Sequence, residues 1–469
     1  MALLRNLADL IRLNWHFCRF SERQIQRYHQ RAVLRLLAMV RRKSPFYREL
    51  YAGREVRGLP DYRGLPTISK SLMMAHFDRL NTAGLKLDEV LRFALAKEMA
   101  HDYLGYYQNR YVVGLSSGTS GNKGIYVTDR RLTQRLPGVF LARGGIRLRD
   151  LPVRILFILR VFSQGFADIN APLIQLRYLP SMTESEKIIA VWNETRSNIL
   201  MAPPSLLRQL LPYAGQINRP PRRIITYAEV LEPEEKSRIS AAFRAPVVEI
   251  YQASEGQIAS PCRCGSLHIN EDLVYVELLA ADGRTPVTQP GERVARMLVT
   301  NLVNTAQPLL RYEMNDIIEL GGPCPCGSHF RVIGRIIGRN DDVLHIRTLA
   351  GGLRAVYPDL VSRWIITTDD RIREFSVEQD ADDHLAITLD LGSLAEPGDG
   401  SAGDSAEDIS NRLRRRFEQE LAAFGVDCRL DIKLQPIVMP TDNRKMKRFR
   451  YQVPGVFPEP SSGQADQPT

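Results

Sequence analysis

The chain has 469 residues, of which 44% are hydrophobic and 25% charged, so it can form a large core and is more consistent with two domains than with one. No apolar run approaches the roughly 18 residues of a membrane-spanning helix, and the charges within residues 1–12 argue against a secretory signal. The formal charge of +10 would suit nucleic acid, but the arginines are dispersed and no nucleic-acid-binding motif accompanies them; nucleotides, coenzyme A or an acidic carrier protein are equally favoured by this charge.

Residues 1–110 are predicted to be mainly helical. The first twelve residues place charged side chains among five apolar ones: Leu3, Leu4, Leu7, Leu10 and Ile11. We interpret this segment as a helix that packs on the body of the protein, with shallow attachment to a membrane as the alternative. Residues 22–42 predict a second helix with a broad apolar stripe, and Ser69 is expected to cap a helix over residues 70–80.

A Ser/Gly turn at residues 114–124 lies between two apolar, β-branched stretches, residues 111–113 and 125–127, so a strand-turn-strand is expected. Its glycines allow a tight turn around an anion, its N–H groups and hydroxyls can donate hydrogen bonds, and Lys123 adds a mobile positive charge. This chemistry suits a polyphosphate. The spacing differs from that of a P-loop and no helical pattern follows directly, which argues against an ordinary P-loop NTPase. A plain surface turn is the alternative.

Between residues 155 and 251, short apolar runs alternate with charged, helix-like segments, as in an α/β domain with a largely parallel sheet. Ligand-binding groups in such folds gather at the carboxyl ends of strands. Two turns are expected at this edge: residues 227–229 after Thr226, and residues 252–256 after a strand that ends at Tyr251. Residues 273–320 instead show period-two patterns that predict an antiparallel subdomain.

The sequence pattern changes at residues 338–342, where we place a domain boundary. Beyond it, residues 371–392 and 430–438 alternate like strands, and residues 405–424 predict an amphipathic helix. The Pro/Ser/Gln-rich residues 455–469 are expected to form a disordered tail.

Four of the six cysteines occur as two Cys-x-Cys pairs, Cys262 with Cys264 and Cys324 with Cys326, and His268 follows the first pair. This clustering favours a reducing, cytoplasmic compartment and offers soft ligands for tetrahedral Zn²⁺. Four protein ligands would leave no position for a water molecule, so the expected role is structural. Free buried thiols are the alternative.

Several separated segments of the chain are informative when they are taken together and in order. They are the Ser/Gly turn, Tyr251-Gln252-Ala253-Ser254-Glu255, Arg311-Tyr312-Glu313-Met314-Asn315-Asp316, Gly338-Arg339-Asn340-Asp341-Asp342 and residues 440–448. In this combination the sequence resembles the adenylate-forming superfamily of acyl-CoA synthetases and related ligases, and within it the phenylacetate-CoA ligase-like branch with its capsule-biosynthesis and deazaflavin-adenylating relatives. It departs from the family pattern at Asn122-Lys123, where a proline is usual, and at Asn443-Arg444, where a glycine is common.

The resemblance implies an α/β protein with a large, multi-sheet N-terminal domain and a small, mobile α+β C-terminal domain. Residues 1–338 would bind ATP and the acid, with a helical part at residues 1–110 and a zinc-bearing β subdomain at about residues 257–335. Residues 339–454 would form a lid domain. Asp341 would be the hinge about which this domain rotates between adenylation and thioester formation.

The activity implied by the resemblance is ATP-dependent activation of a small-molecule carboxylic acid as an acyl-adenylate, with release of pyrophosphate. A thiol, either coenzyme A or the phosphopantetheine of an acidic carrier protein, would then accept the acyl group. Transfer to an amine, which gives an amide, is one alternative. A catalytically silent nucleotide-binding protein is another, against which the presence of Glu255 and Lys445 argues. The protein could form a homodimer under each of these interpretations.

The resemblance also assigns roles to individual residues. The phosphates of ATP would be bound by Ser116, Ser117, Gly118, Thr119, Ser120, Gly121 and Lys123. Adenine would lie against Ala228, Glu229 and Tyr251, with Ser254 in the same cofactor-binding set. Asp316 would accept hydrogen bonds from the ribose hydroxyls, with Arg339 nearby, and Glu255 would help to hold Mg²⁺ as well as contribute to catalysis.

Lys445 would stabilise the charge that develops during adenylation, because a point charge on a flexible stem suits a residue that must arrive and leave. The neighbouring Lys447 and Arg448 leave the register of this motif open. The metal cluster of the phenylacetate-type branch is best matched by Cys262, His268, Cys324 and Cys326, and Cys264 is a substitute for Cys262.

Overall fold

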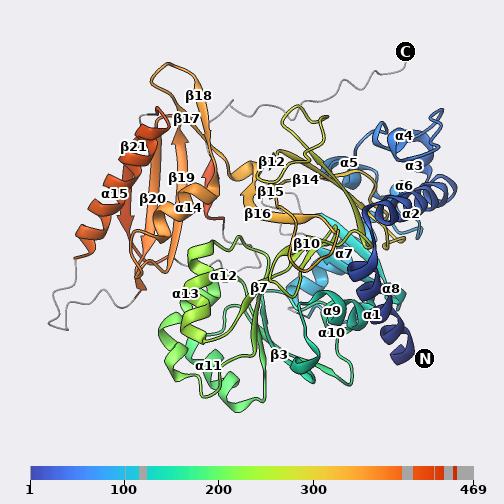
Figure 1. Ribbon diagram of the computed structural model, residues 1–469, viewed down its shortest axis with the longest axis horizontal. Helices are drawn as coiled ribbons and strands as arrows, with labels where there is room; N and C mark the ends of the chain where they lie inside the picture. Colours follow the sequence, from blue (N-terminus) through green and yellow to red (C-terminus); the bar gives the residue numbers. More distant parts are fainter. Residues whose placement is uncertain are drawn as a thin grey trace. The chain divides into compact units, whose positions relative to one another are not determined.

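The computed structural model describes residues 2–100, 102–115, 124–392, 405–426, 428–437 and 447–451. The described residues form two compact units, unit 1 up to Gly338 and unit 2 from Arg339 onward (Figure 1). Helices combined with several sheets confirm the predicted α/β class. The roles of the two domains remain predictions, and the expected tail at residues 455–469 lies outside the described residues.

Unit 1 begins with a series of helices. They are α1 (Ala2–Arg19), α2 (Glu22–Lys43), α3 (Pro45–Leu50), α4 (Leu59–Arg63), α5 (Lys70–Ala75), α6 (Phe77–Leu80) and α7 (Leu87–Met99). Ser21 and Gln24 form a capping box at the start of α2. Ser69 caps α5 as predicted, since its hydroxyl accepts a hydrogen bond from the backbone N–H of Leu72 at 3.2 Å. The single helix expected over residues 70–80 is wrong, because it is divided at His76.

Helix α1 packs on unit 1 against α9 (Leu136–Arg143), in accord with the interpretation that residues 1–12 belong to a helix packed on the body of the protein. The two helices approach closely at Gly138, where a Cβ atom would lie 2.4 Å from the backbone oxygen of Asn6. Leu13 contributes to a core cluster with Val139 and Leu273. The apolar residues that the sequence suggested for this contact are mostly not the ones that make it. Four of them are exposed: Leu3, Leu4, Leu7 and Ile11.

A buried carboxylate, Asp272, fastens α1 to the rest of unit 1. Arg143 donates from Nη2 to Asp272 Oδ2 at 2.8 Å and to Oδ1 at 3.0 Å, and His16 Nδ1 lies 3.1 Å from Oδ2. Tyr28 of α2 donates to the backbone oxygen of Asp272 at 2.9 Å. Burial raises the pKa of Asp272, but Arg143 and His16 outweigh it, so the pKa lies below its ordinary value.

The preceding residue, Glu271, fastens α2 in the same way. His29 Nε2 lies 2.7 Å from the backbone oxygen of Glu271, and Arg331 donates from Nε to its Oε1 at 2.7 Å. Burial raises the pKa of Glu271, but Arg331 and His29 lower it further than burial raises it. The carboxylates of the consecutive residues Glu271 and Asp272 therefore bind histidines of the consecutive helices α2 and α1.

The predicted strands on either side of the Ser/Gly turn are confirmed. β1 (Tyr111–Leu115) pairs antiparallel with β2 (Ile125–Asp129), with Gly114 opposite Tyr126. The connecting residues 116–123 lie outside the described residues, and so do Ser116, Ser117, Gly118, Thr119, Ser120, Gly121 and Lys123 of the predicted phosphate site. Two short helical segments, α8 (Arg130–Thr133) and η1 (Leu148–Asp150), flank α9.

A five-stranded sheet follows, and all its strands are parallel, as predicted. In the order β4-β3-β5-β6-β7 it contains β3 (Val153–Leu159), β4 (Ile174–Pro180), β5 (Ile199–Met201), β6 (Arg223–Thr226) and β7 (Val247–Glu249). Alternate side chains of β3 belong to different cores: Leu156 and Ile158 to one, Ile155 and Phe157 to the other. Helices cover both faces (Figure 1). They include α10 (Gln164–Ala167), α11 (Ser185–Glu194), α12 (Pro204–Gln209), η2 (Leu211–Gln216) and α13 (Pro233–Phe243).

The antiparallel part of unit 1 consists of two sheets that share its largest core cluster. The six-stranded sheet, ordered β12-β15-β16-β10-β9-β8, contains β8 (Tyr251–Ala253), β9 (Gly256–Pro261), β10 (Leu267–Ile269), β12 (Arg293–Val294), β15 (Asp316–Leu320) and β16 (Val332–Arg339). The three-stranded sheet contains β11 (Val274–Leu279), β13 (Arg296–Asn301) and β14 (Tyr312–Met314). The expectation that a strand ends at Tyr251 is wrong, because β7 stops at Glu249 and Tyr251 begins a strand of another sheet.

Unit 2 has its own core around a four-stranded sheet, ordered β21-β20-β19-β22. Its elements are η3 (Asn340–Asp342), β17 (Leu344–Arg347), β18 (Leu353–Val356), α14 (Pro358–Ile366), β19 (Glu374–Ala381), β20 (His384–Asp390), α15 (Ala406–Ala423), β21 (Arg429–Leu434) and β22 (Phe449–Tyr451). Trp364 of α14 contacts Phe417 of α15, with ring centroids 5.2 Å apart. None of the described helices combines the length and apolarity needed to cross a bilayer.

Candidate nucleotide and metal sites

Glu255 lies in the turn between β8 and β9, where two tyrosines from other strands meet it. The hydroxyl of Tyr126 donates to Glu255 Oε1 at 2.7 Å and lies 3.0 Å from the hydroxyl of Tyr312. Asn301 Nδ2 donates to the backbone oxygen of Glu255 at 2.7 Å. Because Tyr126 is in β2, Glu255 adjoins the strand that follows the Ser/Gly turn. Sequence reasoning missed Tyr126 and Tyr312, although Tyr312 stands inside a quoted motif.

The electrostatics around Glu255 favour a cation. Burial raises the pKa of Glu255, and the hydrogen bond from Tyr126 lowers it by less than burial raises it. The negative charge of Asp316 raises this pKa further. A divalent cation bound by Glu255 would stabilise its carboxylate in the charged form.

Tyr251 and Asp316 are joined directly. The hydroxyl of Tyr251, at the start of β8, donates to Asp316 Oδ2, at the start of β15, at 2.6 Å. The segment before Asp316 is held by Arg311, which forms a buried, two-pronged pair with Glu277 at 2.9 and 3.0 Å. The structure therefore brings together three predicted site residues, Glu255, Tyr251 and Asp316. Ser254 shares the turn with Glu255 and is exposed.

The predicted adenine turn, Ala228 and Glu229, follows β6 at the carboxyl edge of the parallel sheet. Thr226 pairs with Glu249 of β7, so this turn and Tyr251 leave the sheet at the same edge. Ala228 is exposed and adopts a left-handed backbone conformation with φ of 67°. The carboxylate of Glu229 accepts hydrogen bonds from the N–H and hydroxyl of Ser205 at 3.0 and 2.9 Å, which fixes the turn to the start of α12.

Aromatic side chains gather beside this turn. Tyr227, which precedes Ala228, lies 5.6 Å from Phe157 between ring centroids. Phe157 in turn lies 5.0 Å from Phe166, and Phe162 stacks on Tyr178 at 4.8 Å. This aromatic cluster comes from residues 155–179 and the adjoining turn.

In unit 2, Asp341 lies in the short 3-10 segment η3. Lys447 Nζ is 4.0 Å from Asp341 Oδ2 and 3.8 Å from Asp342 Oδ1. Arg339 Nε is 3.9 Å from Asp341 Oδ1. Lys445 lies outside the described residues. The choice between Lys445 and Lys447 as the catalytic lysine therefore remains a prediction.

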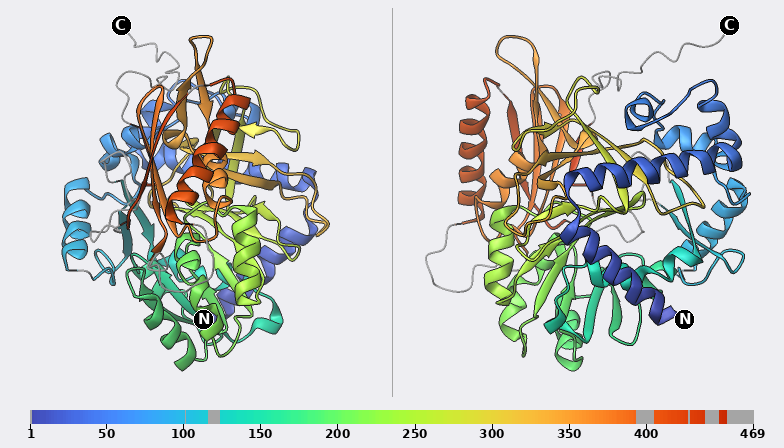
Figure 2. Two further views of the ribbon diagram at one scale, coloured as in Figure 1. Left: turned by 90° about the vertical axis from the view of Figure 1, so that its left-hand side faces the viewer. Right: turned by 45° about the vertical axis from the view of Figure 1, so that its right-hand side comes forward.

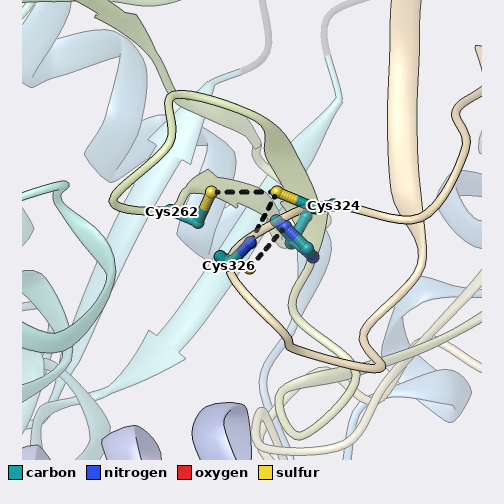
Figure 3. A group of neighbouring side chains, drawn as sticks. Cys262, Cys324 and Cys326 are labelled. Carbon is teal, nitrogen blue, oxygen red and sulfur yellow. Dashed lines mark hydrogen bonds between the residues drawn. The ribbon is translucent and has the colours of Figure 1, made fainter.

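Four cysteine and histidine side chains converge in the six-stranded sheet region: Cys262, His268, Cys324 and Cys326. One potential ligand atom from each lies within 4.8 Å of all the others. Figure 3 shows the sulfurs of Cys262 and Cys324 pointing toward each other, and they are 3.6 Å apart. Cys326 Sγ lies 3.4 Å from His268 Nε2. Cys264, the sequence alternative to Cys262, is exposed and is not part of this group.

The surroundings of two of these side chains, His268 and Cys324, suit a metal ligand. His268 Nδ1 lies 2.8 Å from the backbone oxygen of Phe330, so Nδ1 carries the proton and Nε2 presents its lone pair to the cysteines. Burial raises the pKa of Cys324, but hydrogen bonds from Ser266 and the backbone N–H of Cys326 outweigh it and lower the pKa to about 6. Three sulfurs and one imidazole nitrogen fit the donor set of a tetrahedral Zn²⁺ site.

Comparisons with known proteins agree with the sequence resemblance. No family model matches the chain. Protein CapK of Staphylococcus aureus is 29% identical over 35% of this chain and 37% of its own length. The phenylacetate-coenzyme A ligase of Thermus thermophilus is 24% identical over 76% of this chain and 78% of its own.

The fold agrees as well. The crystal structure of 2-hydroxyisobutyryl-CoA ligase in complex with R3-HIB-AMP superposes with a TM-score of 0.69 at 15% identity, over 92% of this chain and 90% of that chain. The same ligase in complex with 2-HIB-AMP superposes with a TM-score of 0.70 at 16% identity and the same coverage. The resemblance to the phenylacetate-CoA ligase-like branch of the adenylate-forming superfamily is thereby confirmed.

Proposed function

We propose that this phenylacetate-CoA ligase-like chain, an adenylate-forming ligase by relatives and fold, activates a carboxylic acid with ATP and transfers the acyl group to the thiol of coenzyme A. The phosphopantetheine of an acidic carrier protein is the second candidate acceptor. The observation that carries the proposal is the convergence of Glu255, Tyr251 and Asp316 beside the strand that follows the Ser/Gly turn. These groups come from three distant parts of the sequence, residue 126, residues 251–255 and residue 316, and suit one nucleotide.

The proposed reaction has two steps, and the candidate residues would bind different parts of ATP. A carboxylate oxygen of the acid attacks the α-phosphorus of ATP, a new P–O bond forms, and the bond to the bridging oxygen of pyrophosphate breaks. A thiolate then attacks the acyl carbon and AMP leaves. The residues 116–121 and Lys123 would hold the phosphates, and Asp316 the ribose. Mg²⁺ held by Glu255 would neutralise charge on the phosphates.

The aromatic cluster supports an aryl or medium-length acyl acid as substrate. Rings offset or tilted at centroid distances of about 5 Å can extend their packing to a further aromatic group. The relatives named phenylacetate-coenzyme A ligase act on such an acid by name. An amine acceptor, which would give an amide, is the runner-up within the same chemistry.

The proposal is tested by pyrophosphate release across a panel of aryl, branched and linear carboxylic acids with ATP and Mg²⁺. At least one acid should stimulate release, and adding coenzyme A should give a product whose mass equals the acid plus coenzyme A minus water. Release without a thioester, followed by an amide when amines are added, would favour the runner-up. ATP binding without release for any acid would leave only the silent nucleotide-binding protein.

Replacing Lys445 with alanine is expected to lower the adenylation rate by roughly 10²-fold to 10³-fold, because one charge that stabilises the transition state is lost. Thioester formation from a supplied acyl-adenylate should change little. The matched control is Lys447→Ala, which removes only a partly exposed ion pair with Asp341 and Asp342. If Lys447→Ala abolishes adenylation and Lys445→Ala does not, the register is wrong.

We further propose that Cys262, His268, Cys324 and Cys326 hold a structural Zn²⁺, which would tie the ends of β9, β10 and the segment before β16. Metal analysis of the purified protein should give about one zinc per chain. Cys324→Ser should lose the zinc and lower the midpoint of thermal unfolding. Cys264→Ser should keep the zinc and the unfolding midpoint of the wild type. Loss of zinc in Cys264→Ser would instead place Cys264 in the ligand set, and a wild-type protein without zinc would mean free thiols.

A further inference from the structure

Helix α1 presents an apolar stripe to solvent. Its buried side faces unit 1 with Asp9, Leu13, His16 and Phe20. On the other side, large apolar residues are between 49% and 70% exposed: Leu3, Leu4, Leu7, Ile11 and Trp15. Their spacing of three or four residues places them along one face of the helix. We call these five residues the apolar stripe.

Positive charge is concentrated in the part of the chain that carries this stripe. Residues 1–43 contain ten Lys or Arg and two acids, which is a net charge of +8 out of +10 for the whole chain. Arg5, Arg12 and Arg19 recur every seven residues along α1 and so follow one flank of the stripe. On α2, an arginine row repeats every four residues on the exposed side: Arg23, Arg27, Arg31 and Arg35.

Both helices are anchored to unit 1. Both lie in front of the sheets of unit 1 in the right-hand view of Figure 2. The buried contact of His16 with Asp272 fixes α1, and that of His29 with Glu271 fixes α2, so the two helices are attached to consecutive residues. The stripe and the arginine row are therefore presented on a preformed scaffold, so binding would not require either helix to order.

We propose that the apolar stripe and the arginine row bind the surface of anionic phospholipid membranes, with α1 parallel to the bilayer. Apolar side chains of such helices enter the headgroup region by about 5–10 Å, a depth at which tryptophan is favoured. Guanidinium groups pair with lipid phosphates. A second copy of the chain is a poorer occupant, because a symmetric contact would oppose two surfaces of charge +8.

The test is sedimentation of the full-length protein with two kinds of vesicle, phosphatidylcholine alone and an equal mixture of phosphatidylcholine and phosphatidylglycerol. The protein should bind the mixed vesicles, bind phosphatidylcholine weakly, and be released by salt. Ile11→Asp should weaken binding about tenfold or more. The triple variant R23Q/R27Q/R31Q should weaken it by about fivefold per arginine. Pyrophosphate release should be unchanged in both.

Two controls match these variants in exposure and chemistry. Leu349→Asp adds the same charge at an apolar residue of unit 2 that is 78% exposed, and Arg415→Gln removes an exposed arginine from α15. Neither should affect binding. Equal binding to both vesicle types, or unchanged binding of Ile11→Asp and of the triple variant, would overturn the proposal. So would light scattering that shows a wild-type dimer, a monomeric Ile11→Asp variant and no vesicle binding by either.

Discussion

Replacing Glu255 with glutamine is expected to lower acid-dependent pyrophosphate release by roughly 10²-fold to 10³-fold. Glutamine keeps the size of the side chain and can still accept the hydrogen bond from Tyr126, which is 2.7 Å long in the native protein. It removes the negative charge that would help to hold Mg²⁺. The loss should therefore appear in the rate and in the concentration of Mg²⁺ needed for half-maximal activity, while the midpoint of thermal unfolding stays nearly unchanged.

The matched control is Glu313→Gln, which changes a carboxylate of β14, the strand of Tyr312, that pairs with Arg296 and Thr67 instead of the candidate site. It should retain pyrophosphate release. Because burial raises the pKa of Glu255, protons compete with Mg²⁺ as the pH falls, so the wild type should need more Mg²⁺ in acidic buffer. A Glu255→Gln variant with near-normal Mg²⁺ dependence would remove Glu255 from the metal site.

Replacing Asp272 with asparagine is expected to lower the free energy of unfolding by about 3–5 kcal/mol, because it leaves the buried guanidinium of Arg143 without its counter-charge. The change would also weaken the attachment of His16 on α1. Denaturant unfolding of both proteins at neutral pH measures the difference. The control is Glu55→Gln, which removes a pair with Arg57 in which both side chains are largely exposed, and it should change stability by less than about 0.5 kcal/mol.

The effect of Asp272 depends on pH in a defined direction. The pKa of Asp272 in the folded protein lies below its ordinary value of 3.8. Its stabilising contribution is therefore complete above pH 3.8 and is lost as the pH falls through the folded pKa. The difference between wild type and Asp272→Asn should narrow in that acidic range. A constant difference across it would mean that packing, and not charge, causes the loss.

Features that depend on local pattern could be predicted from the sequence. The apolar stripe of residues 22–42 predicted α2, which spans Glu22–Lys43, and β-branched runs predicted β1 and β2. The quoted motifs predicted that Glu255 and Asp316 belong to one site, and the structure brings them close enough to interact electrostatically. That these residues bind one nucleotide remains a prediction.

Features that depend on distant partners could not be predicted in this way. Tyr126 meets Glu255 across 129 residues, and nothing near either residue signals the contact. The first helix has apolar residues on two faces, and the face that packs includes Asp9 and His16, since Arg135 and Asp272 bind them. The division of residues 247–253 between two sheets was not predicted either, because a single apolar run does not show which sheet each of its residues joins.

The consecutive acids Glu271 and Asp272 also restrict how this protein can evolve. The carboxylate of Asp272 pairs with His16 of α1 and that of Glu271 with His29 of α2, so a single inserted or deleted residue at this position would break at least one of these pairings. Length changes between homologous chains should consequently avoid this short segment and fall in the neighbouring surface turns, such as the one at residues 281–285.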